Sequence, residues 1–495
     1  MASQNFSEEI SMHILLTGAT GFVGRSTVAY LLGLGHQITA YVRNLEQSRN
    51  QLGKDVELLS HLDPDSKLQG VLETTDCVIN LAGEQLAGVR WTATKKKRFI
   101  SSRVDLTKRI SNQIIKCKTP PKIFLSASAV GFYNDSYTIP SDEETPKGTG
   151  FLRDLCDQWE QAALQSTVNG TRVVLMRIGI VLGREGGFLK QVGLPFEYGI
   201  GNYIARGNQV IPWIHISDVL GIIRFCIENQ EVSGPINLVS PNPSTWKTFS
   251  KSLAKLLKVK IVIPVPKFLL TLVYGEGADV LASSQYVLPK ALERFGYNFI
   301  YDSLEPALEE EFTAEYTTVT RFVDSSDDLW NARESNHKSD LPKPTYCLIS
   351  KSQVQSSQNH VFNFFSSPLN LGLTTPSWMN FHIQEGEDVV KNGSQFVYKI
   401  NIGPIPLQWK SKIIHWDPNH EFVDLQIKGP YKLWWHRHKL TKQDGDTILM
   451  EDTVLYKIPM GYLGRIAHKL VIRKILLRIF NYRKKVIEQR FTKAI

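Results

Sequence analysis

The chain has 495 residues, of which 42% are hydrophobic and 21% are charged, a composition typical of a soluble globular protein. It is too long for one typical core, so it predicts two or three domains. The net charge is +9, but Arg465–Ile495 alone holds ten Lys or Arg and one Glu, so the rest of the chain is nearly neutral. This distribution excludes a nucleic-acid-binding surface spread over the whole protein.

The five cysteines are scattered along the chain, odd in number and without C-x-x-C spacing. This pattern argues against a disulfide framework and against a cysteine zinc site. There is no run of about 18 apolar residues, and the first residues lack the features of a signal peptide. We therefore expect a cytoplasmic protein.

The first predicted element is the stretch His13–Gly24, HILLTGATGFVG, in which an apolar run opens into three glycines before a helical pattern over 25–34. This order predicts a strand, a tight turn and the start of a helix. Gly18, Gly21 and Gly24 leave no Cβ where the backbone turns, where a pyrophosphate approaches and where helix and strand pack. The spacing is one residue longer in its first gap than G-x-G-x-x-G, and a plain glycine-rich loop is the alternative.

The next apolar run, Gln37–Asn44, predicts the second strand of a βαβ unit. An Asp or Glu at its end would accept the ribose hydroxyls of NAD, whereas this strand ends in Arg43. A guanidinium suits a 2′-phosphate, so the sequence favours NADP(H) over NAD(H). The alternative is a surface arginine without a ligand.

Two further apolar runs predict strands that end in small or hydroxyl side chains, Asp76–Gly83 and Lys122–Tyr133. Ligands of open parallel sheets collect at the carboxyl ends of the strands. We therefore expect Asn80, Ala82 and Gly83 to border the cofactor.

Several motifs follow one another along residues 12–312: TGATGFVG, VINLAG, SASAVGFY, RIGIVLG, PWIHISD, NLVSPNP and VLPKALERFGYNF. In this order they resemble the epimerase-like branch of the extended short-chain dehydrogenase/reductases, some of which carry a cell-division-inhibitor label. The resemblance implies an α/β fold, a Rossmann doubly wound parallel sheet with a small C-terminal substrate lobe. The lobe is expected mainly over 180–210 and 235–312.

The resemblance also implies roles for single residues. Arg43 matches the 2′-phosphate contact, and Trp213 and His215 are expected to contact the substrate, with a structural histidine as the alternative for His215. The phosphate loop is matched by Gly18, Thr20, Gly21, Phe22, Val23 and Gly24.

The expected catalytic side chains depart from the wider superfamily. Ser128 matches its catalytic serine, but the Tyr and Lys that carry the proton fall on Leu152 and Cys156, and neither residue can replace them. Tyr133 lies five residues beyond Ser128 and is the candidate replacement acid or substrate contact. The hypothesis is that Ser128 and Tyr133 together hold a carbonyl or hydroxyl beside the nicotinamide.

A polar stretch, 313–344, predicts a linker. Beyond it, residues 345–495 alternate in period 2 and end in one long helix, an order that resembles the polyketide-cyclase/START-like helix-grip domains. The resemblance implies an α+β domain whose curved sheet wraps the helix and leaves a cavity for an apolar ligand. Aromatic candidates for the cavity are Trp378, Phe381, Trp409, Trp416, Trp434 and Trp435.

His436 and His438 alternate onto one face of a predicted strand. No third ligand is readable from the spacing, so we expect no metal and place the two histidines at the cavity rim or on the surface. The basic helix from Arg465 predicts a buried apolar stripe with a solvated basic face; contact with anionic membrane lipids is the alternative.

These patterns together predict an NADP(H)-binding oxidoreductase or epimerase-like enzyme that acts on a small polar substrate and carries a module for an apolar ligand. Two alternatives remain: a non-catalytic, NADP(H)-responsive regulatory protein and a lipid or metabolite carrier. The sequence indicates no nucleic-acid partner and sets no oligomeric state.

Overall fold

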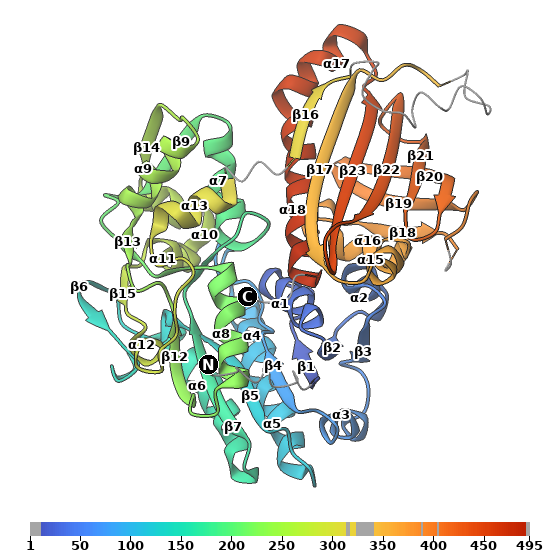
Figure 1. Ribbon diagram of the computed structural model, residues 1–495. Coiled ribbons are helices and arrows are strands. Elements are labelled where there is room, and N and C mark those ends of the chain that lie inside the picture. Colours follow the sequence, from blue (N-terminus) through green and yellow to red (C-terminus); the bar gives the residue numbers. More distant parts are fainter. Residues whose placement is uncertain (1–10, 313–316, 323–340, 388–389, 403–404, 492–495) are drawn as a thin grey trace, which may run out of the picture. The chain divides into compact units, whose positions relative to one another are not determined.

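The computed structural model describes residues 11–312, 317–322, 341–387, 390–402 and 405–491. The chain forms two compact units (Figure 1). The N-terminal unit comprises most of the chain up to residue 313, and the C-terminal unit includes everything after it. Within the described parts, no helix is long and apolar enough to cross a membrane.

A seven-stranded sheet forms the centre of the N-terminal unit, and the pairs from β12 to β2 are parallel. The strand order changes direction between β1 and β4, and ligands bind at such a switch point. The predicted Rossmann sheet is thereby confirmed. In spatial order the strands are β12 (Gly234–Leu238), β7 (Arg172–Ile178), β5 (Ile123–Ala129), β4 (Cys77–Asn80), β1 (His13–Thr17), β2 (Gln37–Val42) and β3 (Val56–Ser60).

The central strands are apolar because helices cover both faces of a parallel sheet. Ile14, Leu15 and Leu16 of β1 have no exposed surface, and neither have Val78 and Ile79 of β4. The helices that connect the sheet strands are α1 (Phe22–Gly33), α2 (Leu45–Leu52), α3 (Asp65–Leu72), α4 (Ala93–Ile100), α5 (Leu106–Lys116), α6 (Phe151–Leu164) and α8 (Ile216–Glu228).

A smaller lobe of this unit carries two-stranded sheets and short helices around its own core of Phe196, Trp246, Phe249 and Leu253. Its paired strands are β6 (Ser136–Ser141) with β15 (Gln285–Val287), β8 (Ile180–Leu182) with β11 (Trp213–His215), β9 (Ile200–Ile204) with β14 (Ile261–Val265), and β10 (Val210–Ile211) with β13 (Ser244–Thr245). Its helices are α7 (Gly187–Glu197), α9 (Trp246–Leu256), α10 (Lys267–Tyr274), α11 (Ala278–Ala282), α12 (Lys290–Arg294) and α13 (Leu304–Phe312).

The C-terminal unit contains an antiparallel eight-stranded sheet. Helix α18 (Arg473–Phe491) lies along it (Figure 1). The other α-helices among the described residues after 313 are α15 (Gln358–Phe365), α16 (Leu371–Thr374) and α17 (Gly461–Ala467). In spatial order the strands are β16 (Thr317–Arg321), β17 (Tyr346–Gln355), β23 (Thr447–Lys457), β22 (Leu433–Lys442), β21 (Glu421–Lys428), β20 (Ile405–Asp417), β19 (Gln395–Ile402) and β18 (His382–Glu385).

The linker prediction for 313–344 is wrong at Thr317–Arg321, which form the edge strand β16 and pair with β17. This short segment is polar on average, but Thr and Val are β-branched and suit an edge strand with one solvated face. The predicted linker residues 323–340 lie outside the described residues.

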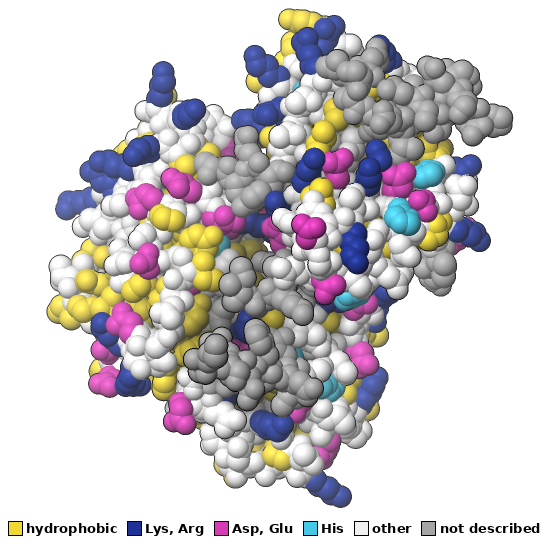
Figure 2. Space-filling view, in the orientation of Figure 1, with side chains coloured by type: hydrophobic (Ala, Val, Ile, Leu, Met, Phe, Trp, Pro, Cys, Tyr) yellow, Lys and Arg dark blue, Asp and Glu magenta, His cyan; other side chains and the backbone are white. Residues whose placement is uncertain are grey.

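The predicted C-terminal helix is divided between two environments. Leu476, Phe480, Val486 and Ile487 of α18 are buried against the sheet. Around α17, in contrast, the large apolar side chains of Tyr462, Leu463 and Ile466 are exposed. Figure 2 shows hydrophobic side chains (yellow) and Lys or Arg side chains (dark blue) together at the top of this unit. The solvated basic face is thus accompanied by apolar side chains, and the membrane contact stays a prediction.

Candidate functional site

The turn between β1 and α1 has a backbone that only glycine allows. Gly18 adopts a φ of +70°, and a Cβ there would lie 2.7 Å from the carbonyl carbon of Leu81. The amide of Gly21 donates a hydrogen bond of 2.9 Å to the carbonyl of Gly18 and closes the turn. The turn therefore lies directly against the segment that follows β4.

Helix α1 begins at Phe22, so the N–H groups of its first turn have no partners within the helix and can receive an anion. A Cβ at Gly24 would overlap the carbonyl oxygen of Gly18. Thr20 and Val23 are half-buried beside this turn. We call this turn, residues 18–24, the phosphate cradle. A side chain at Gly18 would meet the backbone of Leu81, and one at Gly24 would meet the carbonyl of Gly18.

The ring of Phe22 joins the cradle to the smaller lobe. A Cβ at Gly183 or at Gly186, in the loop after β8, would overlap this ring. The motif RIGIVLG ends at Gly183, and its spacing alone does not predict this contact. The glycine cluster over 183–187 is the signal that could have revealed the contact.

Arg43 follows β2 directly and its side chain is exposed. Lys95 donates a 2.6 Å hydrogen bond to Glu84 and lowers the pKa of that carboxyl, and the positive charges of Arg98 and Arg43 act in the same direction. Arg43 is therefore within electrostatic range of the segment after β4, at the same edge of the sheet as the cradle.

Asn80 lies beneath this edge. Thr17 donates a 2.6 Å hydrogen bond to its side-chain oxygen, and its amide nitrogen donates to Thr107. Thr17 in turn accepts a hydrogen bond from the backbone of Ala82. Asn80 is buried, so in this structure it joins the ends of β1 and β4, and its predicted border with the cofactor stays a prediction.

Gly83 leaves room for a buried arginine. A Cβ at Gly83 would lie 2.9 Å from the guanidinium carbon of Arg103, which donates to the carbonyl of Glu84 at 2.8 Å. Burial lowers the pKa of Arg103 to about 10. This arginine therefore fixes the path of the chain after β4.

Ser128 and Tyr133 belong to one buried polar network. Ser128 donates a 2.6 Å hydrogen bond to Glu160, and Arg177 donates to both oxygens of that carboxylate at 2.8 Å. Arg177 also donates to the hydroxyl of Tyr133, which donates to Asn237. Sequence reasoning missed Glu160 and Arg177, although Arg177 begins the motif RIGIVLG.

Burial and neighbouring charges shift the pKa values of side chains in this network. Burial raises the pKa of Tyr133 to about 12, against the opposing effect of Arg177. Burial alone would lower the pKa of Arg177, but hydrogen bonds to Glu160 outweigh it and raise that pKa. Both hydroxyl hydrogens are thus committed to partners within the protein, and the catalytic roles of Ser128 and Tyr133 stay predictions.

The positions matched to the missing Tyr and Lys lie beside this network. Leu152 and Cys156, both on α6, are the neighbours that a Cβ at Gly131 would meet, at about van der Waals distance. Gly131 follows β5, the strand that carries Ser128. Burial raises the pKa of the Cys156 thiol to about 12, so it stays protonated at neutral pH.

Trp213 and His215 lie inside the smaller lobe, and neither has exposed surface. The indole nitrogen of Trp213 donates to the carbonyl of Asn242 at 3.0 Å. The backbone N–H of Ser217 donates to Nδ1 of His215, so Nε2 carries the hydrogen that faces Glu311 at 3.0 Å. Both side chains have partners within the protein, and their contact with a substrate stays a prediction.

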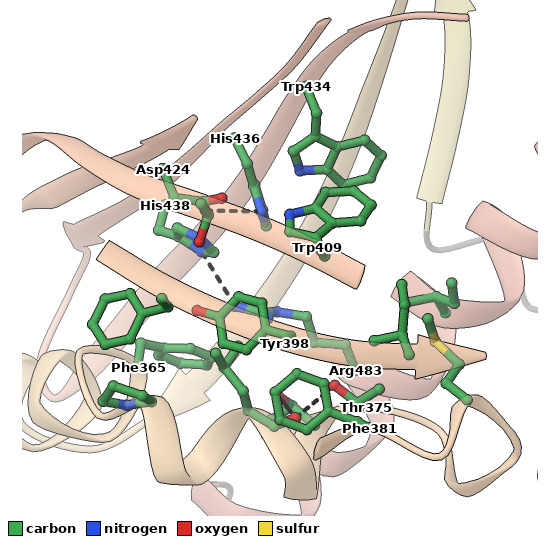
Figure 3. A pocket seen from close by; sticks show the side chains of 18 of the residues that line it. Phe365, Thr375, Phe381, Tyr398, Trp409, Asp424, Trp434, His436, His438 and Arg483 are labelled. Atoms are coloured by element: carbon green, nitrogen blue, oxygen red, sulfur yellow. Dashed lines mark hydrogen bonds and ion pairs between the residues drawn. The ribbon is translucent and has the colours of Figure 1, made fainter. Parts of the chain in front are cut away.

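A cavity of about 200 Å³ lies within the C-terminal unit (Figure 3). Of the six aromatic candidates, Phe381, Trp409 and Trp434 line it. His436 and His438 are 7% and 4% exposed in its wall, which corrects their expected place at the rim or on the surface. They are buried because β22 is paired on both sides and α18 covers this part of its face.

Two family models match the chain. The model of the NAD dependent epimerase/dehydratase family matches residues 14–238, and a domain of unknown function (DUF1731) matches residues 265–311. Both matches end before the C-terminal sheet begins.

Relatives match the same share of the chain. Epimerase family protein YfhF of Bacillus subtilis is 34% identical over 60% of this chain and 97% of its own length. Epimerase family protein SDR39U1 of Homo sapiens is 33% identical over 60% of this chain and 99% of its own length.

Solved structures are similar to the same part of the chain. The crystal structure of human SDR39U1 with NADPH is 32% identical, with a TM-score of 0.56, over 61% of this chain and 100% of that one. A nucleoside-diphosphate sugar epimerase from Corynebacterium glutamicum is 28% identical, with a TM-score of 0.50, over 61% of this chain and 58% of that one. Through its N-terminal unit, the chain belongs to the NAD dependent epimerase/dehydratase family.

Proposed function

We propose that the N-terminal unit binds NADP(H) and acts as an oxidoreductase or epimerase on a small polar substrate. The observation that carries this proposal is the cradle at Gly18 and Gly24, with Arg43 at the end of β2. A Cβ at either glycine would meet backbone atoms of the chain, so both glycines are needed for the close backbone packing that forms this turn. The human relative that was solved with NADPH supports the choice of cofactor.

Different groups of the chain fit the pyrophosphate and the 2′-phosphate of the cofactor. The N–H groups at the start of α1 would receive the pyrophosphate, and the exposed guanidinium of Arg43 would pair with the 2′-phosphate. When bound, the nicotinamide supplies or accepts a hydride. Leu152 and Cys156 cannot carry the accompanying proton, so that proton has to use another group near Ser128 and Tyr133.

Turnover separates this enzyme from the alternative, a regulatory protein that only binds the cofactor. Both versions predict binding, but only the enzyme exchanges the hydrogen at C4 of the nicotinamide with a substrate. Incubation of the chain with C4-deuterated NADPH and candidate keto-sugar nucleotides, whose carbonyl carbon can accept the hydride, is expected to show loss of deuterium from the cofactor by mass spectrometry. Retention of all label with every substrate class would favour the regulatory protein.

Arg43→Ala is expected to weaken NADPH binding by about 10- to 100-fold and to leave NADH binding almost unchanged, because only NADPH has the 2′-phosphate that the guanidinium pairs with. Titration calorimetry with both cofactors measures the difference. Arg294→Ala, an exposed arginine of the same unit, is the control and should change neither. Equal losses for both cofactors would show that Arg43 does not distinguish them.

For the C-terminal unit we propose a ligand-binding module of the polyketide-cyclase/START-like kind. Its support is an antiparallel sheet with α18 along it and a cavity lined mostly by aromatic and aliphatic side chains. An apolar cavity of about 150 Å³ holds a benzene ring, so about 200 Å³ suits a compact aromatic or a short acyl group. The cavity favours such a ligand over a long lipid chain.

Ile400→Trp is expected to abolish binding of a small apolar fluorescent probe, because Ile400 lines the cavity and an indole would fill it. Ile427→Trp is the matched control: it makes the same exchange on the same sheet at a side chain that is 53% exposed. Fluorescence titration of the full chain measures both. Unchanged probe binding by Ile400→Trp would place the probe elsewhere.

A further inference from the structure

The wall of the C-terminal cavity brings together two histidines and an aspartate from neighbouring strands. His436 and His438 lie on β22, and Asp424 pairs with His436 from β21. One atom from each side chain lies within 4.8 Å of the other two, and this is the one such group among the described residues. We propose that Asp424, His436 and His438 bind one divalent transition-metal ion, with zinc as the first candidate.

The distances suit a tetrahedral ion. Nδ1 of His436 and Nε2 of His438 lie 3.4 and 3.2 Å from the same oxygen, Oδ2 of Asp424. Zinc bonds of about 2.0–2.2 Å in tetrahedral geometry place neighbouring ligand atoms roughly 3.3 Å apart. Two edges of the required triangle are therefore present before any metal is added.

The hydrogens of the two rings give a second, independent argument. The opposite nitrogens, Nε2 of His436 and Nδ1 of His438, lie 3.2 and 2.7 Å from Oδ1 of Asp452. Two neutral histidines carry two ring hydrogens, whereas four nitrogen–carboxylate contacts would need four. The two ring centroids lie only 3.9 Å apart.

A metal ion satisfies all four contacts with both rings neutral. The two N–H groups donate to Asp452, and the two free lone pairs join Asp424 at the ion. This is the carboxylate–histidine–metal arrangement, in which a second carboxylate fixes the tautomer and the orientation of the ligating rings. Asp452 therefore acts as a positioning residue on β23, cross-strand from His438.

Neighbouring side chains hold this arrangement. Arg483 of α18 pairs with the other oxygen of Asp452 at 3.0 Å, and its Nη2 also lies 3.2 Å from Nδ1 of His438. The contact of His438 Nδ1 with Asp452 is shorter, at 2.7 Å, so we assign the hydrogen of Nδ1 to the bond with Asp452. Phe422 stacks on His438, and the edge of Phe480 meets His436. Figure 3 shows the three ligands on one side of the cavity.

Three protein ligands leave a fourth tetrahedral position, and the three ligating side chains line the cavity. A metal ion there would bind water or an oxygen of the cavity ligand. The ligand class is therefore a compact apolar molecule with one carbonyl, hydroxyl or carboxylate group. This inference does not rest on NADP(H) binding.

The test uses the untagged full chain, treated with a chelator and dialysed against Zn²⁺ or Co²⁺. We expect one zinc per chain by elemental mass spectrometry, and visible absorption bands of tetrahedral Co²⁺. Asp424→Asn and His438→Gln should each lower zinc affinity at least about 100-fold in competition with a chromophoric chelator. Asp452→Asn should lower it about 10- to 100-fold, as losses of such orienting partners do.

His420→Gln is the matched control, because this exposed histidine lies in the turn between β20 and β21 and pairs only with Asp417 among the described contacts of its ring. It should bind zinc as the parent chain does, and every variant should bind NADPH unchanged. Asp424→Asn preserves the shape of a side chain that is 18% exposed, so folding, checked by circular dichroism, should be retained. Less than stoichiometric zinc in the parent chain, or equal affinity in Asp424→Asn, would overturn the proposal.

Discussion

Gly24→Ala is expected to lower the affinity for NADPH at least about 100-fold. The added Cβ would overlap the carbonyl oxygen of Gly18 and lie 2.9 Å from Cα of Ala19, and both are backbone atoms that cannot rotate away. The start of α1 must then move away from β1, and the amides that face the phosphates move with it. Titration calorimetry measures the loss.

Gly70→Ala is the control for this substitution. Gly70 lies in α3 with open space around the position of a Cβ, so alanine there should stabilise the helix by roughly 0.5–1 kcal/mol and leave NADPH binding unchanged. Tight NADPH binding by a folded Gly24→Ala chain would contradict the assignment of the cradle.

Arg177→Met is expected to destabilise the N-terminal unit by about 3–5 kcal/mol, because it leaves the buried carboxylate of Glu160 without its cation. The side chains of Arg177 and Glu160 are 5% and 6% exposed, so solvent cannot replace the lost partner. The hydroxyls of Ser128 and Tyr133 lose their organising group at the same time. Thermal and denaturant unfolding of the full chain measure the change.

Two controls separate burial from charge. The double variant Glu160→Met with Arg177→Met should recover much of the stability, since it removes both charges together. Arg224→Met breaks a partly exposed pair with Glu228 on α8 and should cost no more than about 0.5 kcal/mol. A loss for Arg177→Met as small as that for Arg224→Met would show that the buried pair contributes little.

The Rossmann half could be predicted from sequence because its signals are local. An apolar run, a glycine turn and a helix follow one another directly along the chain, and the structure places β1 and α1 there, with β2 next. Boundaries are less accurate: the helical pattern predicts residue 25 as the start of the helix, whereas α1 begins at Phe22. A helix start is hard to place from sequence because the first turn holds too few residues to show a period of 3.6.

Contacts between distant segments cannot be predicted from the sequence alone. The spacing of His436 and His438 showed one strand face, but Asp424 and Asp452 join them only through the register of β21 and β23 with β22. The Glu160–Arg177 pair likewise depends on the packing of α6 over β7. A sequence without known strand pairing gives no means to choose these partners from among 48 acidic residues.

The contact of Phe22 with Gly183 and Gly186 changes what counts as the cofactor motif. A pattern read only from residues 18–24 describes the surface that meets the phosphates and leaves out the surface on which the aromatic ring rests. The complete requirement is discontinuous: a large ring in the first turn of α1 and two positions without side chains in a loop of the smaller lobe. Engineering of either segment has to treat both as one unit.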